Sequence, residues 1–183
     1  MPELDPLYWH VVRYLVATVF AVACAHKLSS ISAFEAVVKD YELLPPTMAP
    51  LAARLIILFE ISVVTGLASG LWLPWAATLA MLLLALYGAG IGINLARGRR
   101  DIDCGCFGPA GGAKKGNTLS GWLLLRNLSL IALTTLLFVS VADRSLTWLD
   151  LLTIAAATGA GFAAWSAADQ LMANPSRLQR PSP

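Results

Sequence analysis

The chain has 183 residues, of which 57% are hydrophobic and only 13% are charged, and its net charge is +2. Soluble domains carry about 25% charged residues, so this composition excludes an ordinary soluble domain and indicates a membrane protein. The small net charge gives no support for nucleic-acid binding, and three cysteines, an odd number, do not make a closed disulfide framework.

Five apolar segments are long enough to cross a bilayer, which takes about 20 residues. The predicted spans are 7–25, 51–70, 75–95, 119–141 and 148–165. We expect the first to be retained rather than cleaved as a signal, because residues 1–6 carry Glu3 and Asp5 but no cation. Residues 1–170 are predicted to form one transmembrane domain, and the polar residues 171–183 a disordered tail.

The connection between the first two spans is different in kind. Apolar side chains recur in it at helical spacing, with charged residues between them: Ile31, Phe34, Val37, Val38 and Tyr41. This pattern predicts an amphipathic helix in the membrane interface, or a loop helix that packs back on the bundle, ended by Pro45 and Pro46. The predicted fold is therefore an all-α polytopic integral membrane bundle of five transmembrane helices with this interfacial helix.

The cations are distributed unevenly about the predicted spans. With five spans, eleven of the thirteen Lys and Arg residues belong to one face, and only Arg13 and Arg144 belong to the other. Short loops rich in Lys and Arg stay in the cytoplasm. The sequence thus predicts a multi-pass cell-membrane protein with its N-terminus outside and its third connection, residues 97–120, in the cytoplasm.

A few polar residues lie inside the predicted spans. Glu60 and Arg126 each lie on the order of 10 Å from the cation-rich face, at 1.5 Å per residue. Since an unpaired charge in the membrane costs several kcal/mol, we expect these two to pair with each other or to meet a water-filled cavity. Asn94 and Asn127 are further intramembrane polar candidates, and Arg13 and Asp150 form a second candidate pair on the opposite face.

The long third connection contains Asp103-Cys104-Gly105-Cys106-Phe107-Gly108, with three arginines before it and two lysines after it. Nearby cations favour a thiolate over a thiol, so Cys104 and Cys106 are candidate catalytic residues. At one-residue spacing they could form a strained disulfide, exchange disulfides with a partner, or bind a soft metal. The plain alternative is a turn that happens to contain two small residues.

Cys24 lies at the end of the first span, on the same face as the third connection, and His26 follows it closely. Cys24 is a candidate resolving thiol for the Cys104/Cys106 pair, although a small apolar core residue is the simpler interpretation. His26 is a candidate base or ligand, against the simpler interpretation of a solvated histidine. Together with Cys104 and Cys106 they are the alternative ligand set for a soft metal; otherwise no metal site is predicted.

These residues resemble a known family. The Asn94-Leu95-Ala96-Arg97-Gly98-Arg99 stretch, the Cys-Gly-Cys-Phe-Gly element and Arg126-Asn127 are similar to the MauE branch of the MauE/DoxX redox-associated membrane proteins. Lys27, Phe34, Tyr41, Leu44-Pro45 and Glu60 fit the same pattern, and the resemblance covers roughly residues 7–141.

The resemblance implies a four-helix membrane bundle, loosely similar to that of vitamin K epoxide reductase, with the fifth C-terminal transmembrane helix as an extension beyond this four-helix core. It also implies thiol–disulfide exchange through Cys104 and Cys106 with a thioredoxin-like partner, in support of the maturation of disulfide-containing enzymes. Such work in the periplasm would need these thiols outside, against the charge bias. Because all three thiols fall on one face, electrons would pass to a partner or a quinone, and no haem or flavin motif is evident. A copper- or zinc-handling protein and a non-catalytic membrane anchor subunit of an oxidoreductase are the alternative functions.

Overall fold

The computed structural model describes residues 3–99, 102 and 119–173. Within these ranges the chain is helical, and five helices are long and apolar enough to cross a membrane. They are α1 (Pro6–Ser29), α3 (Ala49–Ser69), α4 (Leu73–Ala96), α5 (Gly121–Thr135), which a 3-10 turn η1 (Leu136–Phe138) extends, and α6 (Trp148–Ala173). The predicted all-α polytopic membrane fold is confirmed.

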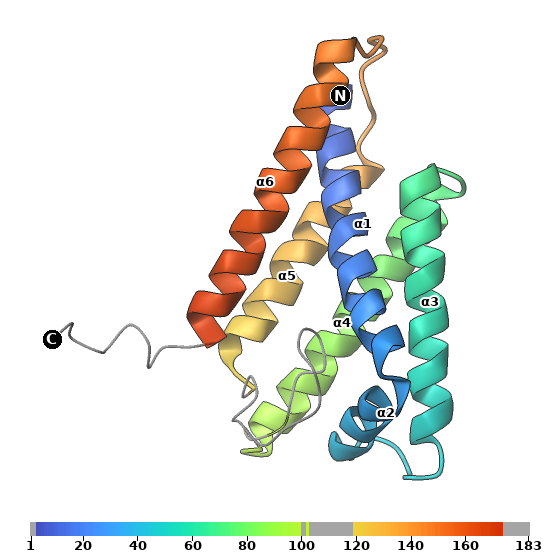
Figure 1. Cartoon of the computed structure of the whole chain (residues 1–183), viewed down its shortest axis with the longest axis vertical. Coiled ribbons are helices and arrows are strands. Elements are labelled where there is room, and N and C mark those ends of the chain that lie inside the picture. The colour runs from blue at the N-terminus through green and yellow to red at the C-terminus, as the bar shows by residue number, and fades with distance from the viewer. Residues whose placement is uncertain (1–2, 100–101, 103–118, 174–183) are drawn as a thin grey trace, which may run out of the picture.

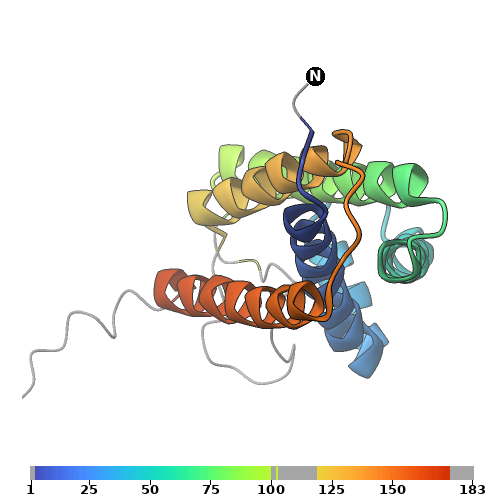
Figure 2. The same ribbon diagram turned by 90° about the horizontal axis from the view of Figure 1, so that it is seen from above.

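The five long helices run up and down beside one another, with α1 in the middle (Figures 1 and 2). α1 packs against α3, α5 and α6, and α4 joins α3 to α5 on the other side. The ends of α1, α4 and α6 therefore lie together with the starts of α3 and α5 (Figure 1). We call this the cationic end, because Lys27, Arg54, Arg97 and Arg99 belong to it.

The core is built by α1, α3, α4 and α5. Its fully or nearly fully buried members include Val16, Phe20, Val63, Leu67 and Leu83. Long apolar side chains also cover the outside of the bundle, such as Leu58 and Leu82, each more than half exposed. Hydrocarbon solvates such residues as well as a protein core does, so an outward apolar surface is expected of membrane-spanning helices.

α6 is a peripheral addition to the four-helix core. It lies along α1, and only about 6% of the residues in its most apolar stretch are buried inside the bundle. Phe162 and Trp165 pack against the core from this helix. It runs to Ala173, well past the predicted end of the fifth span at 165, so that Asp169 is part of the helix. The beginning of the predicted tail, residues 171–173, is therefore helical, and residues 174–183 lie outside the described residues.

The predicted amphipathic helix is present as α2 (Ile31–Asp40). It lies at the cationic end beside the start of α3, and it packs mainly on that helix (Figure 1). Phe34 and Val37 on its apolar side are buried, whereas Lys39 and Asp40 are exposed. Its short length and two-sided character suit a position at the end of a membrane bundle.

The helices approach one another closely where α3 turns into α4, at the end of the bundle opposite the cationic end. A Cβ atom on Gly66 would lie 2.6 Å from the Cβ of Ala76, so only glycine allows this contact. α3 then ends at Gly70, which has φ +79° and whose N–H bonds the carbonyl of Gly66. Left-handed glycine is a common end for a helix, because the conformation satisfies a free carbonyl.

Candidate functional site

Cys104 and Cys106, with the Cys-Gly-Cys element predicted to be reactive, lie in the segment 103–118, outside the described residues. The two ends of that segment are described. Ile102 before it and Leu119 after it pack in one cluster with Ile91 and Leu123, at the cationic end. The segment therefore begins and ends at the same place on the bundle.

The backbone just before this segment is held by polar contacts to the α2–α3 connection. Arg99 forms an ion pair with Glu42, with 2.9 Å between Nη1 and Oε2. Asn94 is completely buried, and its amide donates to the carbonyl oxygens of Tyr41 at 3.2 Å and Gly90 at 3.1 Å. Asn94, predicted as an intramembrane polar residue, thus joins α4 to the end of α2 rather than facing a cavity.

A buried charge cluster joins α1, α3 and α4 inside the cationic end. The ammonium of Lys27 donates to Oε1 of Glu60 as an ion pair, and both side chains are almost completely inaccessible. The hydroxyl of Tyr87 donates to the same oxygen at 2.6 Å. The Lys27 ammonium also lies 5.1 Å from the ring centroid of Phe34 and 4.9 Å from that of Tyr87. A desolvated cation over aromatic faces is stabilised further by the ring quadrupoles.

A second charge cluster joins α5 to α6. Nη1 of Arg126 lies 2.7 Å from Oδ2 of Asp169, and the indole Nε1 of Trp122 donates to Oδ1 of the same carboxylate at 3.0 Å. Trp122 and Arg126 are four residues apart, so they project from the same face of α5. Asp169 accepts both bonds only because α6 continues past its apolar part.

The first of the two expected alternatives, an ion pair of Glu60 with Arg126, is therefore wrong, because Glu60 pairs with Lys27 and Arg126 pairs with Asp169. The two nevertheless line one small cavity of about 30 Å³, together with Lys27, Tyr87 and Asn127. Oε2 of Glu60 and the amide nitrogen of Asn127 are buried and have no hydrogen-bond partner among the residues that the structure describes. A cavity of this size is large enough for a water molecule, which could accept from Asn127 and donate to Glu60.

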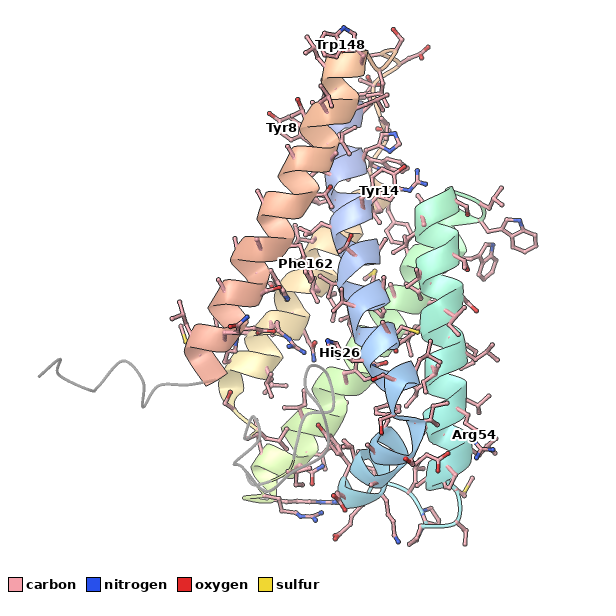
Figure 3. The ribbon with its side chains drawn as sticks, viewed as in Figure 1. Tyr8, Tyr14, His26, Arg54, Trp148 and Phe162 are labelled. Carbon is pink, nitrogen blue, oxygen red and sulfur yellow. The ribbon has the colours of Figure 1, made fainter. Side chains whose placement is uncertain are left out.

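Cys24 and His26 do not come together. Cys24 is 5% exposed and packs with Phe34, Ala53 and Ile57, in an apolar cluster of α1, α2 and α3. His26 is exposed, and Figure 3 shows it near the lower end of α1. Residues two apart on a helix face nearly opposite directions, so the pair does not converge. Among the described residues no group of three His, Cys, Asp or Glu side chains is arranged to hold a metal ion.

Arg13, on the opposite half of α1, caps α3. Its guanidinium donates to the carbonyl oxygens of Leu67 and Ala68, and it lies over the rings of Trp9 and Tyr14. A cation at a helix C-terminus satisfies free carbonyls and favours the helix dipole. The predicted pair of Arg13 with Asp150 is therefore wrong.

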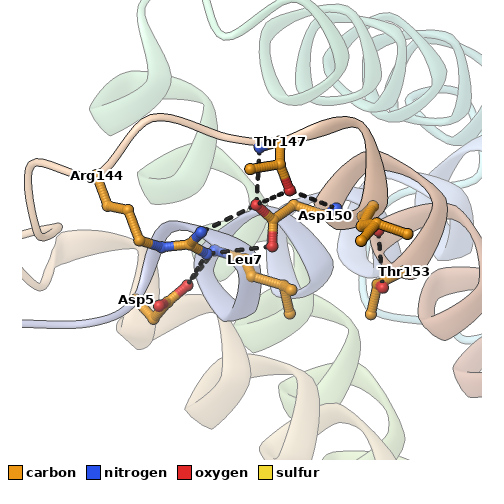
Figure 4. Close-up of polar contacts among 7 residues, drawn as sticks. Asp5, Leu7, Arg144, Thr147, Asp150 and Thr153 are labelled. Carbon is orange, nitrogen blue, oxygen red and sulfur yellow. Dashed lines mark hydrogen bonds and ion pairs between the residues drawn. The ribbon is translucent and has the colours of Figure 1, made fainter.

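Asp150 is bound by Arg144 instead, in the network of Figure 4. Nη1 of Arg144 lies 2.9 Å from Oδ2 of Asp150, and Nη2 lies 3.0 Å from Oδ1 of Asp5. Asp5 caps α1 by accepting from the N–H of Leu7, and Thr147 and Asp150 cap the start of α6 reciprocally. The hydrogen bond from Arg144 lowers the pKa of Asp5, and the two carboxylates raise the pKa of Arg144.

An apolar groove of about 390 Å³ lies between α2, α3 and α4. Its wall includes Phe34, Leu55, Phe59, Leu86 and Gly90, with Lys27 and Tyr87 among its few polar residues. Lys27 and Tyr87 also line the small cavity, so the buried charge cluster separates the two spaces.

The fold and these clusters define an integral membrane protein of the multi-pass type, whose two buried ion pairs lie toward the cationic end of a helical bundle. The chain belongs to the MauE family: the model of that family, described as methylamine utilisation protein MauE, matches residues 5–140. The match covers the four-helix core with η1 and leaves α6 outside, in agreement with the peripheral position of that helix.

Curated relatives named methylamine utilization protein MauE support the family. The protein from Paracoccus denitrificans is 36% identical over 131 residues, which are 71% of this chain and 68% of that protein. Those from Methylophilus methylotrophus and Methylorubrum extorquens are 37% and 35% identical, over stretches that cover 54% and 55% of their lengths. No solved structure matches the chain.

Four members of the buried clusters are not among the candidate site residues of the sequence: Lys27, Tyr87, Trp122 and Asp169. Lys27, named only as part of the family pattern, lies beyond the predicted end of the first span at 25, yet α1 continues to Ser29 and carries Lys27 in its last turn. Asp169 fell between the predicted fifth span and the predicted tail. Tyr87 and Trp122 carry no signal of their own, since an aromatic residue in an apolar helix is ordinarily a packing residue.

Proposed function

We propose that this chain is a membrane thiol–disulfide exchange protein, in which Cys104 and Cys106 react with a thioredoxin-like partner. Its role would be the maturation of disulfide-containing enzymes that serve methylamine utilisation, the process named in the description of its family. The observation that carries the proposal is the attachment of the cysteine-containing segment. Ile102 and Leu119 hold both of its ends in one buried cluster at the cationic end.

The chemistry is an exchange of two sulfur–sulfur bonds. The thiolate of one cysteine attacks the disulfide of the partner, forms a mixed disulfide and releases one partner thiolate. The second cysteine then attacks its neighbour, which closes a Cys104–Cys106 disulfide and releases the partner with two reduced sulfurs. The reverse sequence oxidises the partner. Arg97 and Arg99, beside the start of the segment, favour the thiolate form that such an attack needs.

Cys24 has a different place in this proposal. Its burial among apolar side chains of three helices supports a packing role rather than that of a resolving thiol. Cys24→Ser is therefore the matched control for the two loop cysteines.

The test is the capture of the partner. We expect Cys104→Ser or Cys106→Ser to accumulate a mixed disulfide with a thioredoxin-like protein, detected on non-reducing gels after acid quenching and alkylation, and identified by mass spectrometry. Cys24→Ser should give no such adduct. If neither loop cysteine can be alkylated in any redox buffer and the purified protein holds stoichiometric copper or zinc, metal handling is the better account. If both loop cysteines can be replaced by serine without loss of enzyme maturation, the chain is a non-catalytic membrane anchor subunit.

The orientation belongs to the same proposal. The bias of Lys and Arg toward the cationic end supports a cytoplasmic position for that end and an external N-terminus. In this arrangement the thioredoxin-like partner is a cytoplasmic protein, or an exported protein that reacts with this chain before it leaves the cytoplasm.

A further inference from the structure

The apolar groove between α2, α3 and α4 has the dimensions of a ligand site. Its volume of about 390 Å³ falls within the range of roughly 300–1,000 Å³ that is usual for small-molecule pockets. Its wall is almost entirely hydrocarbon and aromatic, apart from Lys27, Tyr41 and Tyr87.

Part of the groove lining is exposed on the side of the bundle. Leu55 and Phe59 on α3 and Leu86 on α4 line it, and each is between 42% and 54% exposed. α3 and α4 are membrane-spanning helices, so these exposed side chains face the hydrocarbon of the bilayer. A ligand of this groove therefore arrives dissolved in the membrane.

The buried ammonium of Lys27 determines which polar head group a ligand of this groove can have. Lys27 is 4% exposed, and its ammonium has three N–H groups. Within the described residues it donates to Glu60 and, at 3.4 Å, to the hydroxyl of Tyr87, which leaves one N–H for an acceptor in the groove. Because the carboxylate of Glu60 neutralises the charge of Lys27, a neutral acceptor suits the site better than an anion.

We propose that this groove binds a membrane quinone, with a ring carbonyl accepting from Lys27 and the isoprenoid tail along α3 and α4 toward the lipid. A quinone is neutral, carries carbonyl acceptors and is soluble in hydrocarbon over its whole length. A phospholipid matches less well, because its charged head must stay in the interface while Lys27 is buried.

The place of the groove relates this site to the thiol chemistry. Tyr41 and Ile91 line the groove, and both also belong to the cluster that holds Ile102 and Leu119. If the proposed function holds, oxidation of two thiols to one disulfide releases two electrons and two protons, and the quinone takes up all four to become a quinol. Binding of the quinone itself does not depend on that function.

The experiment is photolabelling of the purified full-length protein in nanodiscs, with a short-chain azido-ubiquinone and, separately, with a phosphatidylcholine carrying a diazirine in its acyl chain. We expect the quinone to label peptides of α2, α3 and α4, and unlabelled ubiquinone to compete. Ala52→Phe fills the groove from α3 and should reduce this labelling at least tenfold. Ala68→Phe, the same change at an exposed site on α3 outside the groove, should leave it unchanged.

A second variant tests the head of the ligand. Lys27→Met combined with Glu60→Gln removes the donor and its countercharge together, and we expect about tenfold weaker competition by unlabelled ubiquinone, the loss typical of one hydrogen bond. Labelling by the phosphatidylcholine probe alone, quinone labelling that unlabelled ubiquinone does not compete, or quinone labelling unchanged in Ala52→Phe would overturn the proposal. Repeating the labelling in Cys104→Ser/Cys106→Ser keeps the tests apart: binding should persist there whether or not the thiol proposal survives.

Discussion

The buried pair of Lys27 with Glu60 gives the sharpest energetic prediction. Both side chains are almost fully buried, so neither can regain water when its partner is removed. Removing one member of such a pair costs about 3–5 kcal/mol, because the other charge is left uncompensated. We therefore expect Lys27→Met and Glu60→Gln each to lower the free energy of unfolding by at least about 3 kcal/mol.

The double variant carries the diagnostic result. Lys27→Met combined with Glu60→Gln leaves two neutral side chains of similar volume, so no charge remains unpaired. The Gln amide oxygen can still accept from Tyr87. The combined loss should therefore be smaller than the sum of the single losses by about 2 kcal/mol or more, a large coupling for neighbouring residues. Equilibrium unfolding in mixed micelles, on all four proteins, measures this difference.

Two further cycles serve as controls. Arg144→Met with Asp150→Asn tests an exposed pair, whose coupling should be much smaller because water screens it. Glu60→Gln with Arg126→Leu tests the pairing predicted from sequence. Additive losses for Lys27 and Glu60, within about 0.5 kcal/mol, would refute the reasoning. So would a stronger coupling of Glu60 to Arg126 than to Lys27.

Two other predictions concern the ends of the bundle. Because Arg144 lowers the pKa of Asp5 in the folded protein, the contribution of Asp5 to stability is present above its unfolded pKa and is lost as the pH falls through the folded value. The stability difference between wild type and Asp5→Asn should therefore shrink below about pH 4, and a difference independent of pH would contradict it. For topology, a membrane-impermeant maleimide should label Cys104, as the only cysteine left, in lysed but not in intact cells. Labelling in intact cells would place the cationic end outside.

The membrane class and the helical bundle could be predicted from the sequence. Hydrophobicity over about 20 residues is a local property, and the bilayer imposes it on each segment separately. The amphipathic period of α2 was equally local. The predicted ends differ from the structure: α1 continues to Ser29 and α6 to Ala173. Both helices extend past their apolar stretches, and the polar side chains Lys27 and Asp169 in these extensions are paired in the bundle.

The partners of the buried charges could not be predicted. Depth along a helix follows from residue number, so the sequence correctly indicates that the charges of Glu60 and Arg126 each need a partner or a water-filled cavity. Which charge compensates which depends on the rotation of each helix and on its neighbours. The tertiary structure places α1 beside α3, which brings Lys27 to Glu60, and α6 beside α1, from where Asp169 reaches Arg126 on α5.

The sequence alone determined that this chain is a multi-pass helical membrane protein with two closely spaced cysteines among cations, because composition and spacing are properties of single segments. The tertiary structure decided what lies around those segments. It set the pairing of the buried charges, the cap that Arg13 forms on α3, and the groove between α2, α3 and α4. Each of these brings together residues far apart in the chain, and helix packing, rather than any local preference, sets the distance between them.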